Sequence, residues 1–281
     1  MKLSTGHKHR GILPQSTREK GDTMDKLLIF NGILIAVIAL GLFFVKKYTK
    51  MQGKKNLLLI LSAFFTILCH YSSLAYHQIL DGTAMQYLKA NPNLVLLIYP
   101  CNVVMWSCVM YALLKNKQSR FGKLLCDYIF WFGIVSTLVG MFANVDFIRN
   151  PTLADFDVTK GILAHATLLF NVLLLPVFGF VKIDLKQNIT HIAISILAML
   201  VIGCYCNLLF GVLVSQEMAY QVNSMFLIHS PFDGMPFLTY PVIALIALPI
   251  DFAIFAVCEL FAYEKGNRFY NRYFTNKKED K

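Results

Sequence analysis

A cysteine and a histidine with the chemistry of a nucleophile and a base lie in two apolar segments of the chain. Cys101 stands directly before Asn102, and His165 follows 64 residues after the cysteine. A cysteine attacks a carbonyl carbon only as its thiolate, and a neighbouring imidazole can take the thiol proton. Asn102, Asn207 or Asn223 would then donate hydrogen bonds to the oxyanion. These residue types suit acyl transfer through a thioester.

Two further histidines allow other kinds of site. His70 and His77 are seven residues apart, which places them on one face of a helix as candidate substrate contacts. Together with His165 they also offer three metal ligands, but the chain has no close ligand pair of the His-x-x-x-His kind. We therefore expect no metal. Asp251, in the middle of the last apolar segment, is a candidate proton or ion site.

The elements that carry these residues are long and apolar. Of 281 residues, 57% are hydrophobic and 15% are charged. A segment of about 20 apolar residues spans a bilayer as a helix, and lipid leaves no partner for open backbone groups. The composition predicts an all-α, polytopic membrane helix bundle of about seven transmembrane helices. The apolar stretches are 27–45, 56–78, 93–114, 123–145, 160–181, 188–212 and 240–262.

Basic residues gather in alternate loops. Five lysines lie between residues 46 and 55, and four Lys or Arg residues lie between 115 and 123, whereas the intervening loops are more acidic. Basic loops stay in the cytoplasm. We therefore predict a multi-pass protein, of the cell membrane if it is bacterial, with its N-terminus outside and its C-terminus inside. The net charge of +10 reflects this topology, and we expect no nucleic-acid partner.

The ends of the chain differ from this core. Residues 1–23 form a basic leader, and Met24 stands directly before the first apolar stretch. We interpret the leader as disordered and as lying upstream of a true start at Met24. A seven-helix transmembrane domain over 24–263 follows, and residues 264–281 form a basic cytoplasmic tail.

The predicted topology brings the polar residues to one depth. With a rise of about 1.5 Å per residue, Cys101 and His165 lie at similar distances from the outer interface. His70 falls at the same depth, and His77 lies nearer the interface. Pro100 falls inside the third apolar stretch, where we expect it to free the carbonyl of Leu96 and open the helix.

These residues also carry a family resemblance. The step 97–102 (Leu-Ile-Tyr-Pro-Cys-Asn), His165 two segments later, Asn207 with Asn223, and the sequence 235–240 before the last segment resemble the YwaF-like integral membrane proteins. Animal relatives of that family are regarded as cysteine-centred phospholipid acyltransferases. The resemblance implies Cys101 as the active cysteine and His165 as its partner. Asn102 stands where the animal relatives tend to have histidine, and Tyr99 stands where many bacterial relatives have histidine two places before the cysteine, so the resemblance implies a weaker or a different activity for this chain.

Three functions follow as hypotheses. The first is an acyltransferase without a cofactor that moves fatty acyl chains between membrane phospholipids and lysophospholipids through a thioester on Cys101. The second is a transporter or receptor-like bundle with a polar ligand pocket on the outer side, in which Asp251 senses protons or ions. The third is a structural membrane protein whose polar layer only ties helices together, so that Cys101 and His165 tolerate substitution.

Overall fold

The computed structural model describes residues 17–80, 82–144, 147, 152–232 and 234–262, and its regular elements there are all helices. The leader up to residue 16 and the basic tail 264–281 lie outside the described residues. Residues 17–23 of the leader belong to the first helix. The helices are α1 (Thr17–Tyr48), α2 (Gln52–Leu80), α3 (Ala84–Ala90), η1 (Pro92–Leu94), α4 (Pro100–Leu113), α5 (Arg120–Phe142), α7 (Phe156–Val177), α8 (Leu185–Leu213), α9 (Gln216–Val222), η2 (Ser224–Phe226) and α10 (Tyr240–Ala262).

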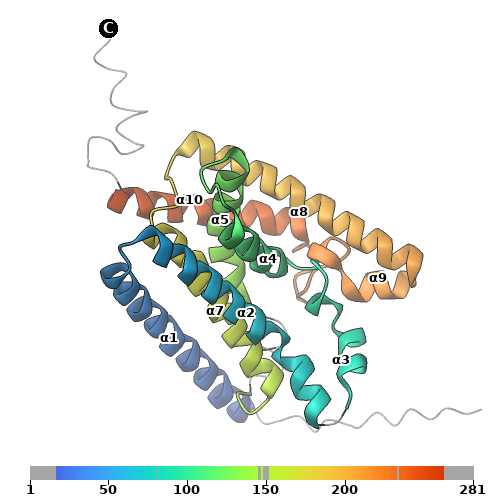
Figure 1. Cartoon of the computed structure of the whole chain (residues 1–281). Helices are drawn as coiled ribbons and strands as arrows, with labels where there is room; N and C mark the ends of the chain where they lie inside the picture. The colour runs from blue at the N-terminus through green and yellow to red at the C-terminus, as the bar shows by residue number, and fades with distance from the viewer. Residues whose placement is uncertain (1–16, 81, 145–146, 148–151, 233, 263–281) are drawn as a thin grey trace, which may run out of the picture.

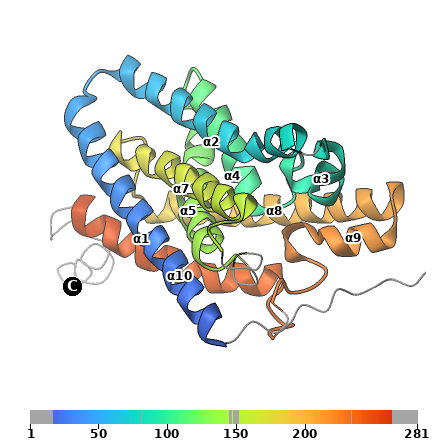
Figure 2. The same ribbon diagram turned by 90° about the horizontal axis from the view of Figure 1, so that it is seen from below.

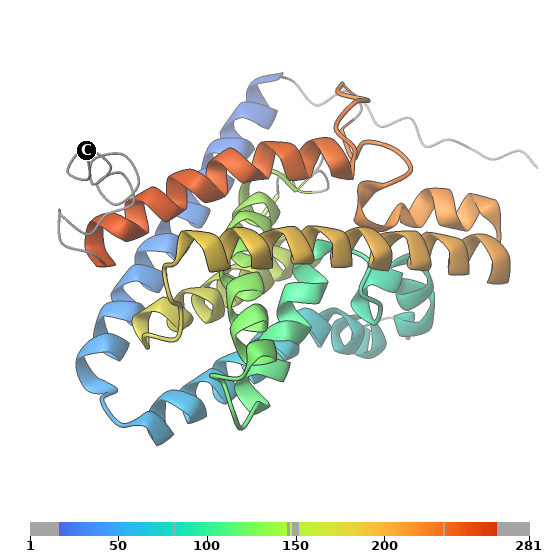
Figure 3. The same cartoon turned by 90° about the horizontal axis from the view of Figure 1, so that it is seen from above.

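Six of these helices are long and apolar enough to cross a membrane, and α4 is a shorter apolar helix. The predicted polytopic helix bundle is therefore confirmed. Helices α1, α2 and α7 run alongside one another, and α5 packs against α7 and α4 (Figure 1). Seen from below, α1 lies along α7 on the side away from α3 (Figure 2). Seen from above, α9 folds back beside the far end of α8 (Figure 3).

The tightest part of the core lies where α4, α5 and α7 meet. Val104, Ile129, Val172 and Leu174 are fully buried there, and Trp131 is 1% exposed. Lipid tails are as apolar as these side chains, so close packing and interhelical hydrogen bonds must hold the helices together. The outward faces of α8 and α10 instead expose large apolar side chains, as lipid-facing helices do.

Buried amides tie the helices together inside this apolar core. Asn171 of α7 donates to Thr66 Oγ1 at 2.7 Å and to the Ser62 carbonyl at 3.1 Å, both on α2. Asn31 of α1 is fully buried and donates to the carbonyl of Met141 on α5 at 2.8 Å. These bonds hold α1 against α5 and α2 against α7 at fixed positions along the helix axes. They thereby also position the residues of α2 and α7 that line the cavity.

The third apolar stretch differs from its prediction. It is not one helix over 93–114, because η1 ends at Leu94 and α4 begins only at Pro100. Proline suits the first position of a helix, where its missing N–H would have no intrahelical partner. The prediction of a free Leu96 carbonyl is also wrong, since that carbonyl accepts a hydrogen bond from the Ile98 N–H at 2.9 Å. Pro100 therefore starts a helix within the bundle rather than opening one.

Candidate functional site

Cys101 is the second residue of α4, in the helix's first turn. Tyr99 caps the helix, and Asn102 completes the cap because its Oδ1 accepts from the Tyr99 N–H at 3.2 Å. The first amides of a helix have no carbonyl partner within the helix and carry partial positive charge. A thiolate or an oxyanion formed at Cys101 would therefore lie in a favourable field. The capping role of Asn102 was not visible from residue spacing alone.

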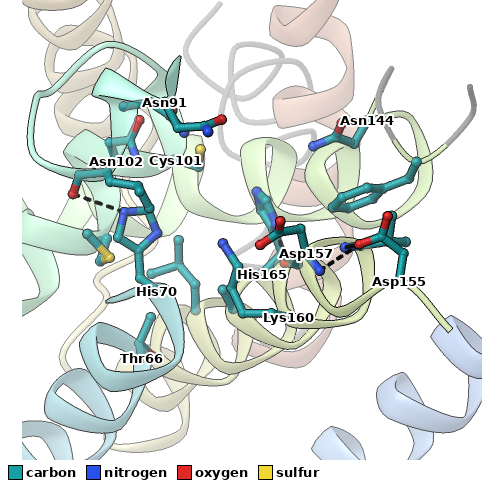
Figure 4. Close-up of a pocket in the computed structure, with 18 of the residues that line it drawn as sticks. Thr66, His70, Asn91, Cys101, Asn102, Asn144, Asp155, Asp157, Lys160 and His165 are labelled. Atoms are coloured by element: carbon teal, nitrogen blue, oxygen red, sulfur yellow. Dashed lines mark hydrogen bonds between the residues drawn. The ribbon is translucent and has the colours of Figure 1, made fainter. Parts of the chain in front are cut away.

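Cys101 lines a cavity of ≈ 470 Å³ that lies among α2, α4 and α7. Of the predicted site residues, His70, Cys101, Asn102 and His165 all line it, and Figure 4 shows them around one space. The cavity is of the size common for small-molecule sites. Its lining is both polar and apolar. The other lining residues are Thr66, Tyr87, Asn91, Asn93, Leu94, Met105, Asn144, Phe147, Asp155, Asp157, Val158, Lys160, Gly161, Ala164 and Leu168.

His165 is held by its own helix. Its Nδ1 lies 2.8 Å from the carbonyl of Gly161, one turn earlier in α7. A carbonyl accepts only, so Nδ1 carries the proton and Nε2 of the neutral ring is left as an acceptor. That is the tautomer a general base requires.

Gly140 of α5 makes the room for this imidazole. A Cβ atom at residue 140 would overlap Cδ2 and Nε2 of His165. Any larger side chain at this position would therefore displace the ring. The sequence analysis missed Gly140. The available signal was an isolated glycine inside a long helical segment, which often marks a close approach.

His70 lies across the cavity from His165 and is also oriented by a carbonyl. Its Nε2 is 3.3 Å from the carbonyl of Leu94, so Nε2 carries the proton and Nδ1 of the neutral ring is the acceptor nitrogen. Among the described residues, no hydrogen bond joins Cys101 to either histidine. The structure thus brings the three side chains to one cavity without pairing the thiol.

His77, the other predicted contact, does not line the cavity. Its Nε2 bonds Asp157 Oδ2 at 3.1 Å, and Tyr87 of α3 donates to the other oxygen of Asp157 at 2.8 Å. The His77 and Tyr87 rings stack at 4.0 Å. Burial, followed by the hydrogen bond to Asp157, raises the pKa of Tyr87, which keeps the phenol a donor. This group fastens α3 to α2 and α7 beside the cavity.

Asn207 and Asn223 also lie outside the cavity. Asn207 accepts from the Ser224 N–H at 2.7 Å and donates to the Ser224 carbonyl at 3.1 Å. Asn223 donates to the His229 carbonyl at 2.7 Å and accepts from two backbone N–H groups. Both amides are engaged in holding the loop that follows α9. The geometry does not bring them to Cys101.

That loop supports the start of α4. Asn223, Met225 and Phe226 have positive φ angles of 43°, 54° and 55°, an uncommon conformation for residues other than glycine. The Met225 N–H and the Ser224 hydroxyl both donate to the Ile98 carbonyl at 2.9 Å. Sequence reasoning missed this contact, because it joins segments 126 residues apart. The strained loop therefore fixes the backbone just before the cysteine.

Two further predictions concerned a metal site and Asp251. Among the described residues, no group of three His, Cys, Asp or Glu side chains is arranged to hold a metal. Asp251 lies in α10 at 5% exposure, and its Oδ1 has no hydrogen-bond partner within the part of the chain that the structure describes. It does not line the cavity.

The fold and the cavity define the chain as a multi-pass helical membrane protein with a polar site among its helices. The sequence matches the TMEM164 family over residues 22–259, and the chain belongs to that family. No curated protein and no solved structure matches it.

Proposed function

We propose that this protein is an acyltransferase that moves a fatty acyl chain from a phospholipid to a lysophospholipid through a thioester on Cys101. The carrying observation is that one cavity holds a thiol at a helix N-terminus and an imidazole in the tautomer of a base. The mixed lining fits a ligand with a polar head and an apolar chain. The resemblance to the YwaF-like proteins supports the same reaction.

The reaction has two halves. Cys101 Sγ attacks the ester carbonyl, His165 Nε2 takes the thiol proton, and the lysophospholipid leaves with that proton on its hydroxyl oxygen. The acceptor hydroxyl then gives its proton to His165 and attacks the thioester, and the thiol is restored. The Cys101 backbone N–H and the side-chain amide of Asn102 are the donors that we assign to the oxyanion. Substrate binding must bring Sγ and Nε2 within about 3 Å, a distance that often closes only in the complex.

Intact-protein mass spectrometry in phospholipid, with and without hydroxylamine, tests this function. We expect a hydroxylamine-labile acyl adduct on the wild type and none on Cys101→Ser. Cys108→Ser is the matched control, because Cys108 lies on α4 but does not line the cavity. We also expect His165→Gln to slow acyl exchange by roughly 10²–10⁴-fold, the usual contribution of a general base. Normal exchange by Cys101→Ala would refute the covalent role.

The second candidate is a transporter or receptor-like bundle, and Asp251 is the observation that favours it. A buried acid without a hydrogen-bond partner in a membrane helix is commonly functional. That reading predicts pH-dependent ligand uptake or binding that Asp251→Asn abolishes, together with no acyl adduct on Cys101. The structural reading instead predicts that single substitutions at Cys101 and His165 change neither exchange nor binding.

We also propose that the cavity faces the outer side of the membrane. Lys55 and Lys117 lie near the ends of α2 and α4 that are remote from the cavity, and basic ends face the cytoplasm. A tag inserted near residue 235 should react with an impermeant reagent on intact cells. Reaction only after the cells are broken would reverse the orientation.

A further inference from the structure

Lys160 places a positive charge at the wall of the cavity. It lies in the second turn of α7, five residues before His165, and it is half-buried. Figure 4 shows its side chain between His70 and Asp157. Within the described part of the chain, its Nζ makes no hydrogen bond and no salt bridge. A half-buried ammonium without a direct partner is costly, and an anion in the cavity would offset that cost.

The two acids that line the same cavity are already engaged. Both oxygens of Asp157 accept hydrogen bonds, one from Tyr87 and one in the pair with His77. Asp155 caps α7, and its Oδ1 accepts from the Asp157 and Val158 backbone N–H groups. Asp157 interacts with Lys160 through the electrostatic attraction of its charge and not through a hydrogen bond. The ammonium therefore remains available to a ligand.

The two histidines near Lys160 carry no negative charge that would repel an anion. His70 and His165 each direct one ring nitrogen at a backbone carbonyl, and both lie close enough to Lys160 for its charge to act on them. Asn102 lines the same cavity, and its Oδ1 is used on the α4 cap, where it accepts from the Tyr99 N–H. The cavity that holds Cys101 thus has a cation, Lys160, in its wall on the α7 side.

We infer that Lys160 forms a subsite for the phosphate group of the ligand. This inference rests on the proposed function, because it places the phosphate of the lipid so that its ester reaches Cys101. A phosphate carries the negative charge that would offset the charge of Lys160, and its oxygens would accept hydrogen bonds from the ammonium. The same chemistry would also accept a free phosphate ester.

The test measures ligand binding without turnover. Full-length Cys101→Ala protein in a phosphate-free maltoside detergent is titrated with oleoyl lysophosphatidylcholine and with monooleoylglycerol, which has the same chain and no phosphate. We expect Lys160→Gln to weaken binding of the lysophospholipid by about 10- to 100-fold, the worth of a hydrogen bond to a charged group, and to leave monooleoylglycerol unchanged. Lys160→Arg should keep the affinity for the lysophospholipid.

The matched control is Lys89→Gln, which removes an exposed lysine of α3 outside the cavity and should change neither affinity. Competition by glycerophosphate would identify a subsite that recognises the phosphate alone. Without such competition, a Lys160-dependent affinity would identify a lipid headgroup. Equal affinities for the lysophospholipid in Lys160→Gln and its parent overturn the subsite. Tight Lys160-dependent binding with no acyl adduct on wild-type Cys101 would keep the subsite and reject acyl transfer.

Discussion

The two ends of the helix bundle use their polar side chains in opposite ways. At the end remote from the cavity, which we call the packed end, Lys55 donates to the Phe178 carbonyl at 3.2 Å and Lys117 to the Leu114 carbonyl at 3.0 Å. Both lysines thereby neutralise helix C-termini. Burial lowers the pKa of Lys117. At the cavity end, Lys160, Cys101 and His165 face an open space.

The packed end also buries an acid together with its partners. Asp127 of α5 is 2% exposed, and its Oδ2 contacts His191 Nδ1 at 2.5 Å and accepts from Gln187 at 3.0 Å, both on α8. A fully partnered polar group holds helices together, whereas an unpartnered one beside a cavity can bind. We therefore expect substitutions at the packed end to reduce stability, and substitutions of the residues that line the cavity or contact its imidazole to reduce activity.

The largest effect should come from His191→Ala at the packed end. It leaves Asp127 buried without its strongest partner, and breaking such a pair commonly costs about 3–5 kcal/mol. The free energy of unfolding, measured by denaturation in mixed micelles, should fall by that amount. Thr190→Ala, an exposed neighbour on the same helix, is the control. If folded His191→Ala protein showed a changed rate of Cys101 alkylation, the packed end would influence the cavity, and the proposed division of roles between the two ends would be wrong.

Gly140→Ala should give the next largest effect, on activity. The added methyl group overlaps the imidazole of His165 and must displace it. A misplacement of about 1 Å can lower a rate by about 10²-fold. Acyl exchange by the purified variant is the measurement, with Gly32→Ala as the control, because a Cβ at Gly32 meets no atom within 4 Å. Full activity in Gly140→Ala would remove His165 from the mechanism.

Asn207→Ala tests the support of the cysteine at the cavity end. It removes two hydrogen bonds to Ser224, and an unsatisfied buried N–H costs about 1–3 kcal/mol. We expect a lower free energy of unfolding and faster proteolysis after residue 222. Gln221→Ala removes only an exposed bond to Glu217 and serves as the control. If both variants behave alike, the strained loop does not depend on Asn207.

Lys55→Gln at the packed end should have the smallest effect. Its charge lies at the C-terminus of α7, where such a charge is worth about 0.3–1 kcal/mol. The midpoint of thermal unfolding should fall slightly, and less so at high salt because salt screens the interaction. Lys54→Gln, its exposed neighbour, should leave the midpoint unchanged. An equal loss in both variants would mean that the Phe178 carbonyl does not need the lysine.

The sequence by itself determined the membrane helices. Length and apolar composition suffice for that, because lipid enforces internal hydrogen bonding on each spanning segment. The expectation that His70, Cys101 and His165 lie together also followed from the predicted topology, although the depth of Cys101 was counted along a helix from residue 93 that the structure does not contain. The non-helical segment before Pro100 could not be predicted from the sequence, because a helix and an apolar extended segment have similar hydropathy.

Only the tertiary structure decided how the site is built. The contact of Gly140 with His165, the docking of Met225 on Ile98 and the use of Asn207 and Asn223 in a loop all join segments that are distant in the sequence. Residue spacing gives the depth of a side chain in the membrane but not the neighbour its helix face meets. That neighbour depends on how the helices rotate and pack, which is a property of the whole bundle.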